Sequence, residues 1–292
     1  MSKEFYLAHR EGFPVLNFLW KWKVLSTAAL REKFFSHYKH YYSAYNWLNK
    51  HYKGGYISPR TNDQGRFFLW SLDKRGFRVV QERLPVVLRE NGFKSEAHYH
   101  DWLVSALHLG EWLTVTPAGV SLFSEQELRR YQPEHFPLGI PKSITHRADG
   151  YWNRIHKNNS WTIALEVELN LKSKTDYEQV GKFYGDQVEV SRVLWLVNSL
   201  NDVQNIMKGI GRAETEKKNI HSFIILDSFL ALGWSALIEH GPGQGLTIQT
   251  FLLKSLGFNE DLKTVYSDTN LTVNKLLETR RTVTISDTSG RQ

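Results

Sequence analysis

The chain has 292 residues, which suffice for two domains of ordinary size, and its 41% apolar and 13% aromatic residues can form a sizeable core. It has no cysteine, which excludes a disulfide framework and a thiolate zinc site and is consistent with a reducing cytoplasm. No signal-peptide pattern is visible, and the longest apolar run, near 229–238, is too short for a membrane span. The sequence therefore predicts a cytoplasmic protein without a membrane partner.

The net charge of +7 is concentrated near the N-terminus. Residues 1–80 contain 14 Lys and Arg against 5 Asp and Glu, so this segment carries +9 and the remainder of the chain −2. A basic segment favours a polyanion such as DNA, because each phosphate that it neutralises releases counterions. The alternative interpretation is a generic basic surface.

Three short helices and a hairpin are predicted within residues 1–85. Ser26 is expected to cap the second helix, and Gly54-Gly55 to end the third, which runs over 38–51 with Tyr41, Tyr45 and Leu48 on one stripe. Two strand-like runs then flank a turn, at 56–58 and 66–72. This order is typical of a winged helix-turn-helix domain.

In a winged helix-turn-helix domain the third helix enters the major groove of double-stranded DNA and the wing rests on its backbone. The residues that this arrangement predicts near DNA are Lys39, His40, Tyr42, Lys50, Lys53, Arg60 and Arg66. For each of them the alternative is a solvated face. Winged helices also mediate protein contacts, so DNA binding is itself a hypothesis.

Residues 86–120 are predicted to form a helical linker, with helix over 84–109 and a strand at 112–116. His98, His100 and Asp101 look like metal ligands, but two ligands on one helix are better placed at i and i+4. Packing between domains is therefore favoured, and only His100 is considered for a functional role.

The next domain is predicted over 121–257, followed by a polar tail at 258–292. Ser124 and Glu127 have the spacing of a capping box at a short helix. Glu125 and Glu127 are therefore interpreted as capping and solvated charge, with an additional acid of a functional site as the alternative.

The segment 146–172 is predicted to be a hairpin with an acidic face. Side chains alternate between faces along a strand, which places Glu166, Glu168 and Lys172 on one face and the apolar residues of 161–171 on the other. A turn at Lys157-Asn158 would set Asp149 directly opposite Glu166. Directly opposed Cβ atoms are about 5 Å apart, so an acidic cluster there favours a cation between the carboxylates.

A hard cation such as Mg²⁺ or Mn²⁺ suits this cluster, since it binds one or two carboxylates and otherwise water and phosphate oxygens. Asp149 and Glu166 are predicted to bind the ion, and Glu168 to complete its shell or orient a water. Lys172 is predicted to stabilise transition-state charge, although about 13 Å of ideal strand separates it from Glu168. The alternative interpretation is the solvated face of a half-buried sheet.

The remaining pattern predicts a mixed sheet flanked by helices. A helix is expected at 173–189 with Tyr177, Val180, Tyr184 and Val188 on one face, then strand 193–197, a helix near 202–209 and strand 223–226. The glycine-rich run 241–245 lacks a phosphate-loop signature and is interpreted as a surface turn.

Asp149-Gly150, Glu166-Val167-Glu168 and Lys172 resemble the core of the restriction-endonuclease-like PD-(D/E)XK nucleases. Ala148 stands where proline often precedes the aspartate, and Glu168 occupies the usual lysine position, for which Lys172 is the displaced candidate. The resemblance implies metal-dependent phosphodiester cleavage and an α/β (α+β overall) fold with a mixed-sheet nuclease domain.

A narrower resemblance is to MobC-type mobilisation relaxases and replication-relaxation proteins. It is based on the run 168–173, on SEQEL at 124–128 and on the N-terminal segment with its step at 74–76. It implies site-specific nicking at a transfer origin, with accessory mobilisation or coupling proteins as further partners. Tyr151, Tyr177 and Tyr184 remain alternative covalent nucleophiles.

Two other functions stay open. One is a sequence-specific DNA-binding replication or transcription accessory protein with an inactive nuclease-like domain. The other is a protein-interaction adaptor for a DNA-processing complex.

Overall fold

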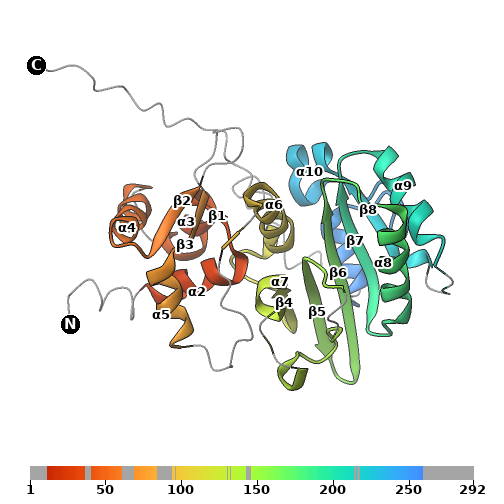
Figure 1. Ribbon diagram of the computed structural model, residues 1–292, viewed down its shortest axis with the longest axis horizontal. Coiled ribbons are helices and arrows are strands. Elements are labelled where there is room, and N and C mark those ends of the chain that lie inside the picture. Colours follow the sequence, from red (N-terminus) through yellow and green to blue (C-terminus); the bar gives the residue numbers. More distant parts are fainter. Residues whose placement is uncertain are drawn as a thin grey trace, which may run out of the picture.

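The computed structural model describes residues 12–36, 41–60, 69–83, 94–95, 97–129, 131, 133–142, 146–213, 215 and 218–258. The expected tail at 258–292 lies, apart from Phe258, outside these residues. The chain forms a mixed α/β structure with a small antiparallel sheet at the N-terminal end and a five-stranded mixed sheet at the other (Figure 1).

The N-terminal unit contains helices and three short strands. Its elements are α2 (Phe13–Trp22), β1 (Leu25–Ser26), α3 (Thr27–Phe35), α4 (Tyr41–Lys53), β2 (Ile57–Arg60), β3 (Leu69–Leu72) and α5 (Lys74–Gln81). The strand order is β1-β3-β2, with both pairs antiparallel. The three predicted helices and the pairing of the two predicted strands are therefore confirmed.

Local chemistry explains the start of α3. The Ser26 side chain accepts a hydrogen bond from the Ala29 backbone N–H at 3.1 Å, which satisfies one of the donors that a helix start leaves unpaired. On α4, Leu48 is buried as expected, but Tyr45 is exposed. The step at 74–76 directly follows β3 and forms the start of α5, which Asp73 caps.

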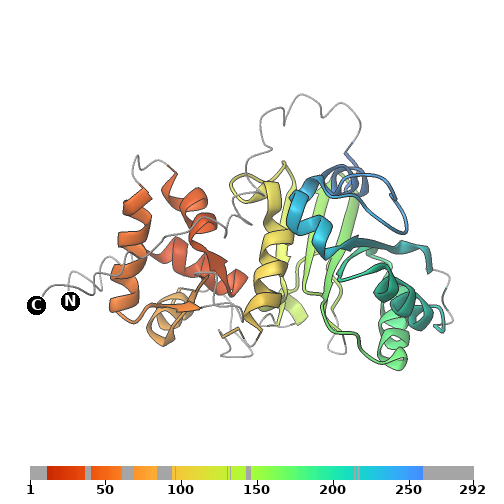
Figure 2. The same ribbon diagram turned by 90° about the horizontal axis from the view of Figure 1, so that it is seen from above.

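Helix α6 (His98–Leu109) lies between the N-terminal unit and the large sheet (Figure 2). Ser105 donates from its hydroxyl to the Val24 carbonyl at 3.1 Å, and Trp234 donates from Nε1 to the Leu107 carbonyl at 2.9 Å. One buried apolar cluster continues from the N-terminal helices through α6 to one face of the sheet.

The large sheet has the order β4-β5-β6-β7-β8. The first three strands are antiparallel, and β6, β7 and β8 run parallel, so the predicted mixed sheet is confirmed. The strands are β4 (Val120–Ser124), β5 (Gly150–His156), β6 (Asn159–Glu168), β7 (Val190–Val197) and β8 (His221–Ile225).

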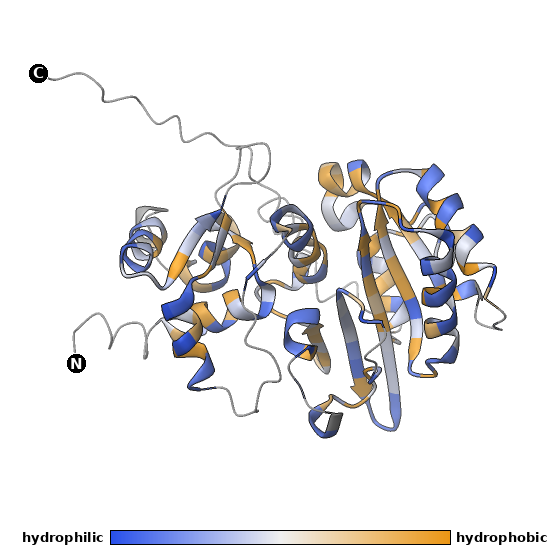
Figure 3. Ribbon diagram, in the orientation of Figure 1, coloured by the Kyte–Doolittle hydropathy of each residue, from blue (hydrophilic) through white to orange (hydrophobic). Residues whose placement is uncertain are grey.

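Helices cover both faces of this sheet, as the parallel crossovers require (Figure 1). Helices α8 (Lys174–Asp186) and α9 (Leu200–Ile210) cover one face, whereas α6, α10 (Leu226–Leu232) and α11 (Ile248–Ser255) cover the other. Ile163, Leu165 and Val167 point into the α6 side and Ala164 into the α8 side, which confirms the predicted alternation within β6. The expected core position of Leu171 is wrong, because the strand ends at Glu168 and Leu171 is exposed. Figure 3 shows apolar residues concentrated in the central strands.

Five short elements complete the described fold. Helix α7 (Glu125–Leu128) and the 3₁₀ turns η2 (Gly110–Trp112) and η3 (Pro133–His135) precede β5. The 3₁₀ turns η4 (Lys218–Ile220) and η5 (Gly233–Ser235) flank β8 and α10.

The expected strand at 112–116 is wrong: a 3₁₀ turn occupies its start, and β4 begins only after the turn at Gly119. The predicted helix of the linker is confirmed from His98, and 84–93 lie outside the described residues. Helix α8 ends before Val188, which is 85% exposed and not on its buried face.

His221 makes the stability of the fold dependent on pH. It is buried, and its Nδ1 accepts from Trp195 Nε1 at 3.1 Å, while burial lowers its pKa to about 4. The unfolded chain binds the proton at about pH 6.5, so stability from this group is complete above that pH and is lost as the pH falls toward 4.

The expected loss is about 1.4 kcal/mol per pH unit over this range. Urea unfolding of the wild type and of His221→Gln, which keeps an acceptor for Trp195, measures it. The wild type should show the steeper decline between pH 6 and pH 4.5, and equal slopes would contradict the prediction.

Candidate functional site

Asp149 ends the hydrogen bonding between β5 and β6. Its backbone N–H donates to the Leu165 carbonyl at 3.0 Å, and Gly150 pairs with Leu165, so the predicted register with Asp149 opposite Glu166 is confirmed. The turn lies at Lys157 and Asn158 as expected, with Lys157 at φ 54°. Beyond this point the Val167 N–H donates at 2.7 Å to Oδ2 of Asp149 in place of a strand partner.

Glu166 is buried on the α8 side of the sheet, where two side chains contact the same oxygen. His146 Nε2 lies 2.7 Å from Glu166 Oε1, and the Tyr184 hydroxyl of α8 donates to that atom as well. Burial lowers the pKa of His146, but the charge of Glu166, its hydrogen bond to the ring and the charge of Asp149 together outweigh burial and raise this pKa. Burial, and then the Glu166 charge, raise the pKa of Tyr184 far above its ordinary value.

Glu168 and Lys172 form an ion pair. Strand β6 ends at Glu168, and the chain then turns, so that Lys172 Nζ reaches Glu168 Oε2 at 2.9 Å. This turn removes the 13 Å separation that an extended strand would impose. The Tyr177 hydroxyl accepts from the Lys172 backbone N–H at 3.0 Å. Burial raises the pKa of Glu168, and the lysine only partly offsets it.

A second charged network approaches Asp149 from the other side of the sheet. His100 Nε2 lies 3.0 Å from the Val167 carbonyl and 3.6 Å from Asp149 Oδ2, and its Nδ1 lies 3.6 Å from Asp101 Oδ1. Burial lowers the pKa of His100, but the two carboxylates outweigh it and raise the pKa to about 10. His100, the residue of this helix that was considered for a functional role, therefore lies next to Asp149, one of the predicted metal ligands.

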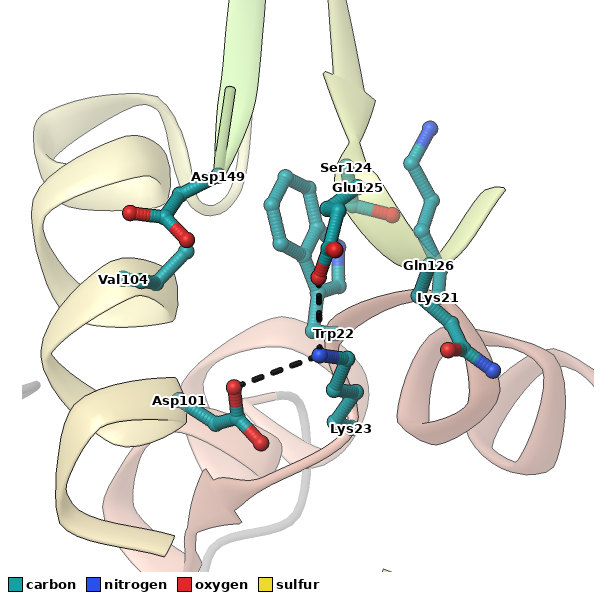
Figure 4. Close-up of a pocket in the computed structure, with 9 residues that line it drawn as sticks. All are labelled: Lys21, Trp22, Lys23, Asp101, Val104, Ser124, Glu125, Gln126 and Asp149. Carbon is teal, nitrogen blue, oxygen red and sulfur yellow. Dashed lines mark hydrogen bonds and ion pairs between the residues drawn. The ribbon is translucent and has the colours of Figure 1, made fainter. Parts of the chain in front are cut away.

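Lys23 of the N-terminal unit completes this network in a small pocket between α2, α6, α7 and the start of β5 (Figure 4). Its Nζ lies 3.3 Å from Asp101 Oδ1 and 3.0 Å from Glu125 Oε2. Burial lowers the pKa of Lys23, and the attraction of Asp101 and Glu125 outweighs it, so the pKa is raised. Asp149 also lines the pocket.

The acids of α7 have structural partners. Ser124 accepts from the Glu127 N–H at 3.2 Å, which confirms the predicted cap, but the Glu127 side chain does not complete a capping box and is not a solvated charge. Glu127 Oε2 pairs with Lys21 at 2.8 Å, and its Oε1 accepts from the Tyr131 hydroxyl at 2.9 Å. Glu125 is bound to Lys23 and therefore belongs to the pocket beside Asp149.

The predicted DNA-contacting residues are only partly described. Lys50 and Lys53 are exposed near the end of α4, and Arg60 donates from Nε to Ser71 Oγ at 3.0 Å across β2 and β3. Tyr42 lies in α4, and Lys39, His40 and Arg66 lie outside the described residues. The interaction of this face with DNA stays a prediction.

The three tyrosines considered as covalent nucleophiles are Tyr151, Tyr177 and Tyr184, and all are buried. Burial raises the pKa of each phenol. A raised pKa keeps the hydroxyl protonated near neutral pH, which disfavours attack on phosphorus.

The donor chemistry of the acids fits a hard cation, although no group of three or more His, Asp or Glu side chains arranged to hold a metal is present among the described residues. Within that part of the chain, Oδ1 of Asp149 and Oε2 of Glu166 have no hydrogen-bond partner from the protein. Two such oxygens suit Mg²⁺ or Mn²⁺, which take their remaining ligands from water and phosphate.

Sequence reasoning did not find the contacts of Lys21, Lys23 and His146. His146 is three residues from Asp149, and this proximity was the one available signal. Lys23 is 78 and 102 residues from its two partners, so no sequence pattern marks it.

Comparisons with protein families, curated proteins and solved structures give no match. Among the described helices, none combines the length and the apolar character needed to cross a bilayer.

Proposed function

We propose that this protein is a metal-dependent DNA endonuclease that binds duplex DNA through its N-terminal unit and nicks it at a specific site. The observation that carries the proposal is the β5–β6 register, which sets Asp149 opposite Glu166 at the end of the pair, with Glu168 two residues further along β6 and Lys172 turned back onto Glu168. A strand-borne acid cluster with a nearby lysine is the arrangement that the resemblance to PD-(D/E)XK nucleases implies.

Each residue has a defined part in this proposal. Asp149 and Glu166 hold Mg²⁺ or Mn²⁺, which supplies an activated water and neutralises phosphate charge when bound. Glu168 orients the attacking water, and its pair with Lys172 keeps that ammonium, 51% exposed, at the edge of the site. Lys172 is thus placed to contact the phosphate and stabilise its developing negative charge.

The basic N-terminal segment supports binding of double-stranded DNA. Its helices and its antiparallel strands occur in the order expected for a winged helix, with Lys50 and Lys53 exposed on α4. The suggested target is a transfer origin, with nicking as in mobilisation relaxases and with mobilisation or coupling proteins as further partners. Binding of duplex DNA by the full chain should weaken steeply with salt, because phosphate contacts release counterions.

The test is a nicking assay on supercoiled plasmids that carry candidate origins, with Mg²⁺ or Mn²⁺. Asp149→Ala and Glu166→Ala should each lower the rate at least about 100-fold, because a lost ligand removes the charge stabilisation of the metal. Glu239→Ala, an acid outside the cluster, is the control and should retain wild-type activity. EDTA should abolish nicking. Equal nicking rates for the wild type and the three variants would contradict the proposal.

A second function is favoured by the partners of the acids. Glu166 already receives two donors and Glu168 an ammonium, which is also what a structural polar cluster requires. The protein would then be a DNA-binding replication or transcription accessory factor without nuclease activity. Salt-sensitive binding of a cognate duplex together with no metal-dependent cleavage would select this alternative.

A further inference from the structure

One oxygen of Glu166 receives both of its protein contacts. His146 Nε2 and the Tyr184 hydroxyl both bond to Oε1, and among the described residues neither of these contacts involves Oε2. The two rings also pack together: the His146 ring lies 5.5 Å from that of Tyr184 and 4.9 Å from that of Phe183. The carboxylate is therefore held in one orientation.

The holding residues are themselves fixed. Tyr184 is fully buried in α8, and its ring lies edge-on to those of Phe183 and His221 at 4.9 and 5.9 Å. Helix α8 starts at a capping box, in which Ser173 accepts from the Asp176 N–H and Asp176 accepts from the Ser173 N–H. Rotation of Glu166 would break two hydrogen bonds and leave buried polar atoms unpaired, which is unfavourable.

We propose that Tyr184 and His146 are positioning residues that restrict Glu166 to binding a cation through Oε2 alone, and that the site thereby selects Mg²⁺ or Mn²⁺ over Ca²⁺. The proposal depends on the proposed function, since it assigns a property to the same acidic site. It adds two residues that do not touch the ion.

The physical reason is the difference between the coordination of the two classes of cation. Mg²⁺ requires nearly octahedral geometry with short bonds, and it binds through few protein oxygens and several waters. Ca²⁺ takes six to eight oxygens and commonly uses both oxygens of one carboxylate. A carboxylate with one oxygen already bonded to two donors satisfies the first requirement and cannot provide the second mode.

The test compares Mn²⁺ binding by wild type, Tyr184→Phe and Tyr131→Phe, using isothermal titration calorimetry or the electron paramagnetic resonance signal of free Mn²⁺. Tyr184→Phe removes one hydroxyl and keeps the ring. Loss of an outer-shell contact typically weakens metal binding 10–100-fold, so Mn²⁺ affinity should fall at least about tenfold. Tyr131→Phe is the matched control, because it removes a similar tyrosine–glutamate bond at Glu127 and should leave Mn²⁺ affinity unchanged.

Competition with Ca²⁺ measures the ratio of the Ca²⁺ and Mn²⁺ affinities, which would not change if Tyr184 had only a structural role. Tyr184→Phe should shift the Ca²⁺ to Mn²⁺ affinity ratio toward Ca²⁺ by about tenfold, since only Mn²⁺ depends on the held orientation. His146→Gln, which retains an N–H donor, should keep more of the wild-type ratio than His146→Ala. This pair remains informative if Tyr184→Phe folds poorly.

The outcomes separate this proposal from the proposed function. Equal Mn²⁺ affinity and an unchanged Ca²⁺ to Mn²⁺ ratio in Tyr184→Phe would overturn the positioning role while leaving the metal site intact. An equal loss for Ca²⁺ and Mn²⁺ would also overturn the selectivity. A wild-type protein that binds no Mn²⁺, alone or with DNA, would overturn both.

Discussion

Replacing Lys23 with methionine is expected to lower the free energy of unfolding by about 3 to 5 kcal/mol, the range measured when one partner of a buried ion pair is removed. Methionine keeps the unbranched side chain but leaves Asp101 and Glu125 without the ammonium that lies 3.3 and 3.0 Å from them. The Lys23 side chain is only 15% exposed, so water replaces little of the lost interaction. Chemical denaturation at neutral pH measures the change.

The backbone of Lys23 shows that this contact outweighs a local cost. Lys23 has φ 59° and ψ −53°, and the Val24 N–H donates to the Trp22 carbonyl at 2.6 Å, which defines a γ-turn of the rare form with positive φ. Such a conformation costs a non-glycine residue about 1–3 kcal/mol. Lys23→Gly should therefore be more stable than Lys23→Ala by about 1 kcal/mol, although both lose the charge.

Lys33→Met is the matched control. Lys33 also belongs to the N-terminal unit and reaches another part of the chain, donating to the Thr114 carbonyl at 3.0 Å, but this exposed bond involves no carboxylate. Its loss should cost less than about 1 kcal/mol. Equal destabilisation by Lys23→Met and Lys33→Met would contradict the stabilising role of the Lys23 ion pairs with Asp101 and Glu125.

Gly150→Ala is expected to destabilise the protein by about 3 kcal/mol, at the upper end of typical overpacking costs. A Cβ at this position would lie 2.4 Å from the His108 ring and 3.1 Å from the Phe123 carbonyl oxygen. His108 has little room to move, because it is fully buried between the rings of Trp22 and Trp152, at 4.9 and 4.7 Å. Its Nε2 also bonds to the Tyr151 carbonyl at 3.0 Å.

This contact gives a physical reason for the glycine that follows Asp149. A side chain at 150 would displace the start of β5 and with it the neighbouring carboxylate. Thermal and urea unfolding of Gly150→Ala in the wild-type and His108→Ala backgrounds form a double-mutant cycle. The alanine should cost clearly less once the ring is absent, and an equal cost in both backgrounds would show that the ring is not the cause.

Residue patterns along the chain were enough to predict the β5–β6 hairpin and its register. Period-two alternation distinguished the two faces of β6, and the turn at Lys157 and Asn158 then set Asp149 opposite Glu166. The caps at Ser26 and Ser124 were also readable, since a cap acts within three residues. These features depend on neighbours along the chain or on one hairpin partner.

Sequence patterns failed where competing local signals had similar strength. The aromatic and threonine residues at 112–116 favoured a strand, but Trp112 is buried against the ring of Trp234, 4.9 Å away, in a 3₁₀ turn. Val188 has the spacing of a residue on the apolar face of α8, but the helix ends at Asp186, before Val188 is reached. Tertiary packing decided both, because it outweighs propensities of a few tenths of a kcal/mol per residue.

The side chains that surround the acids are set by packing between elements far apart in the sequence. It brought Lys23 to Asp101 and Glu125, His100 to Asp149, and His146 with Tyr184 to one oxygen of Glu166. Spacing in the sequence cannot encode such contacts, because they join elements that meet only when the sheet and its covering helices have packed. Hydrogen-bond geometry is directional at the scale of single atoms, so the partner of each carboxylate oxygen is set by that packing.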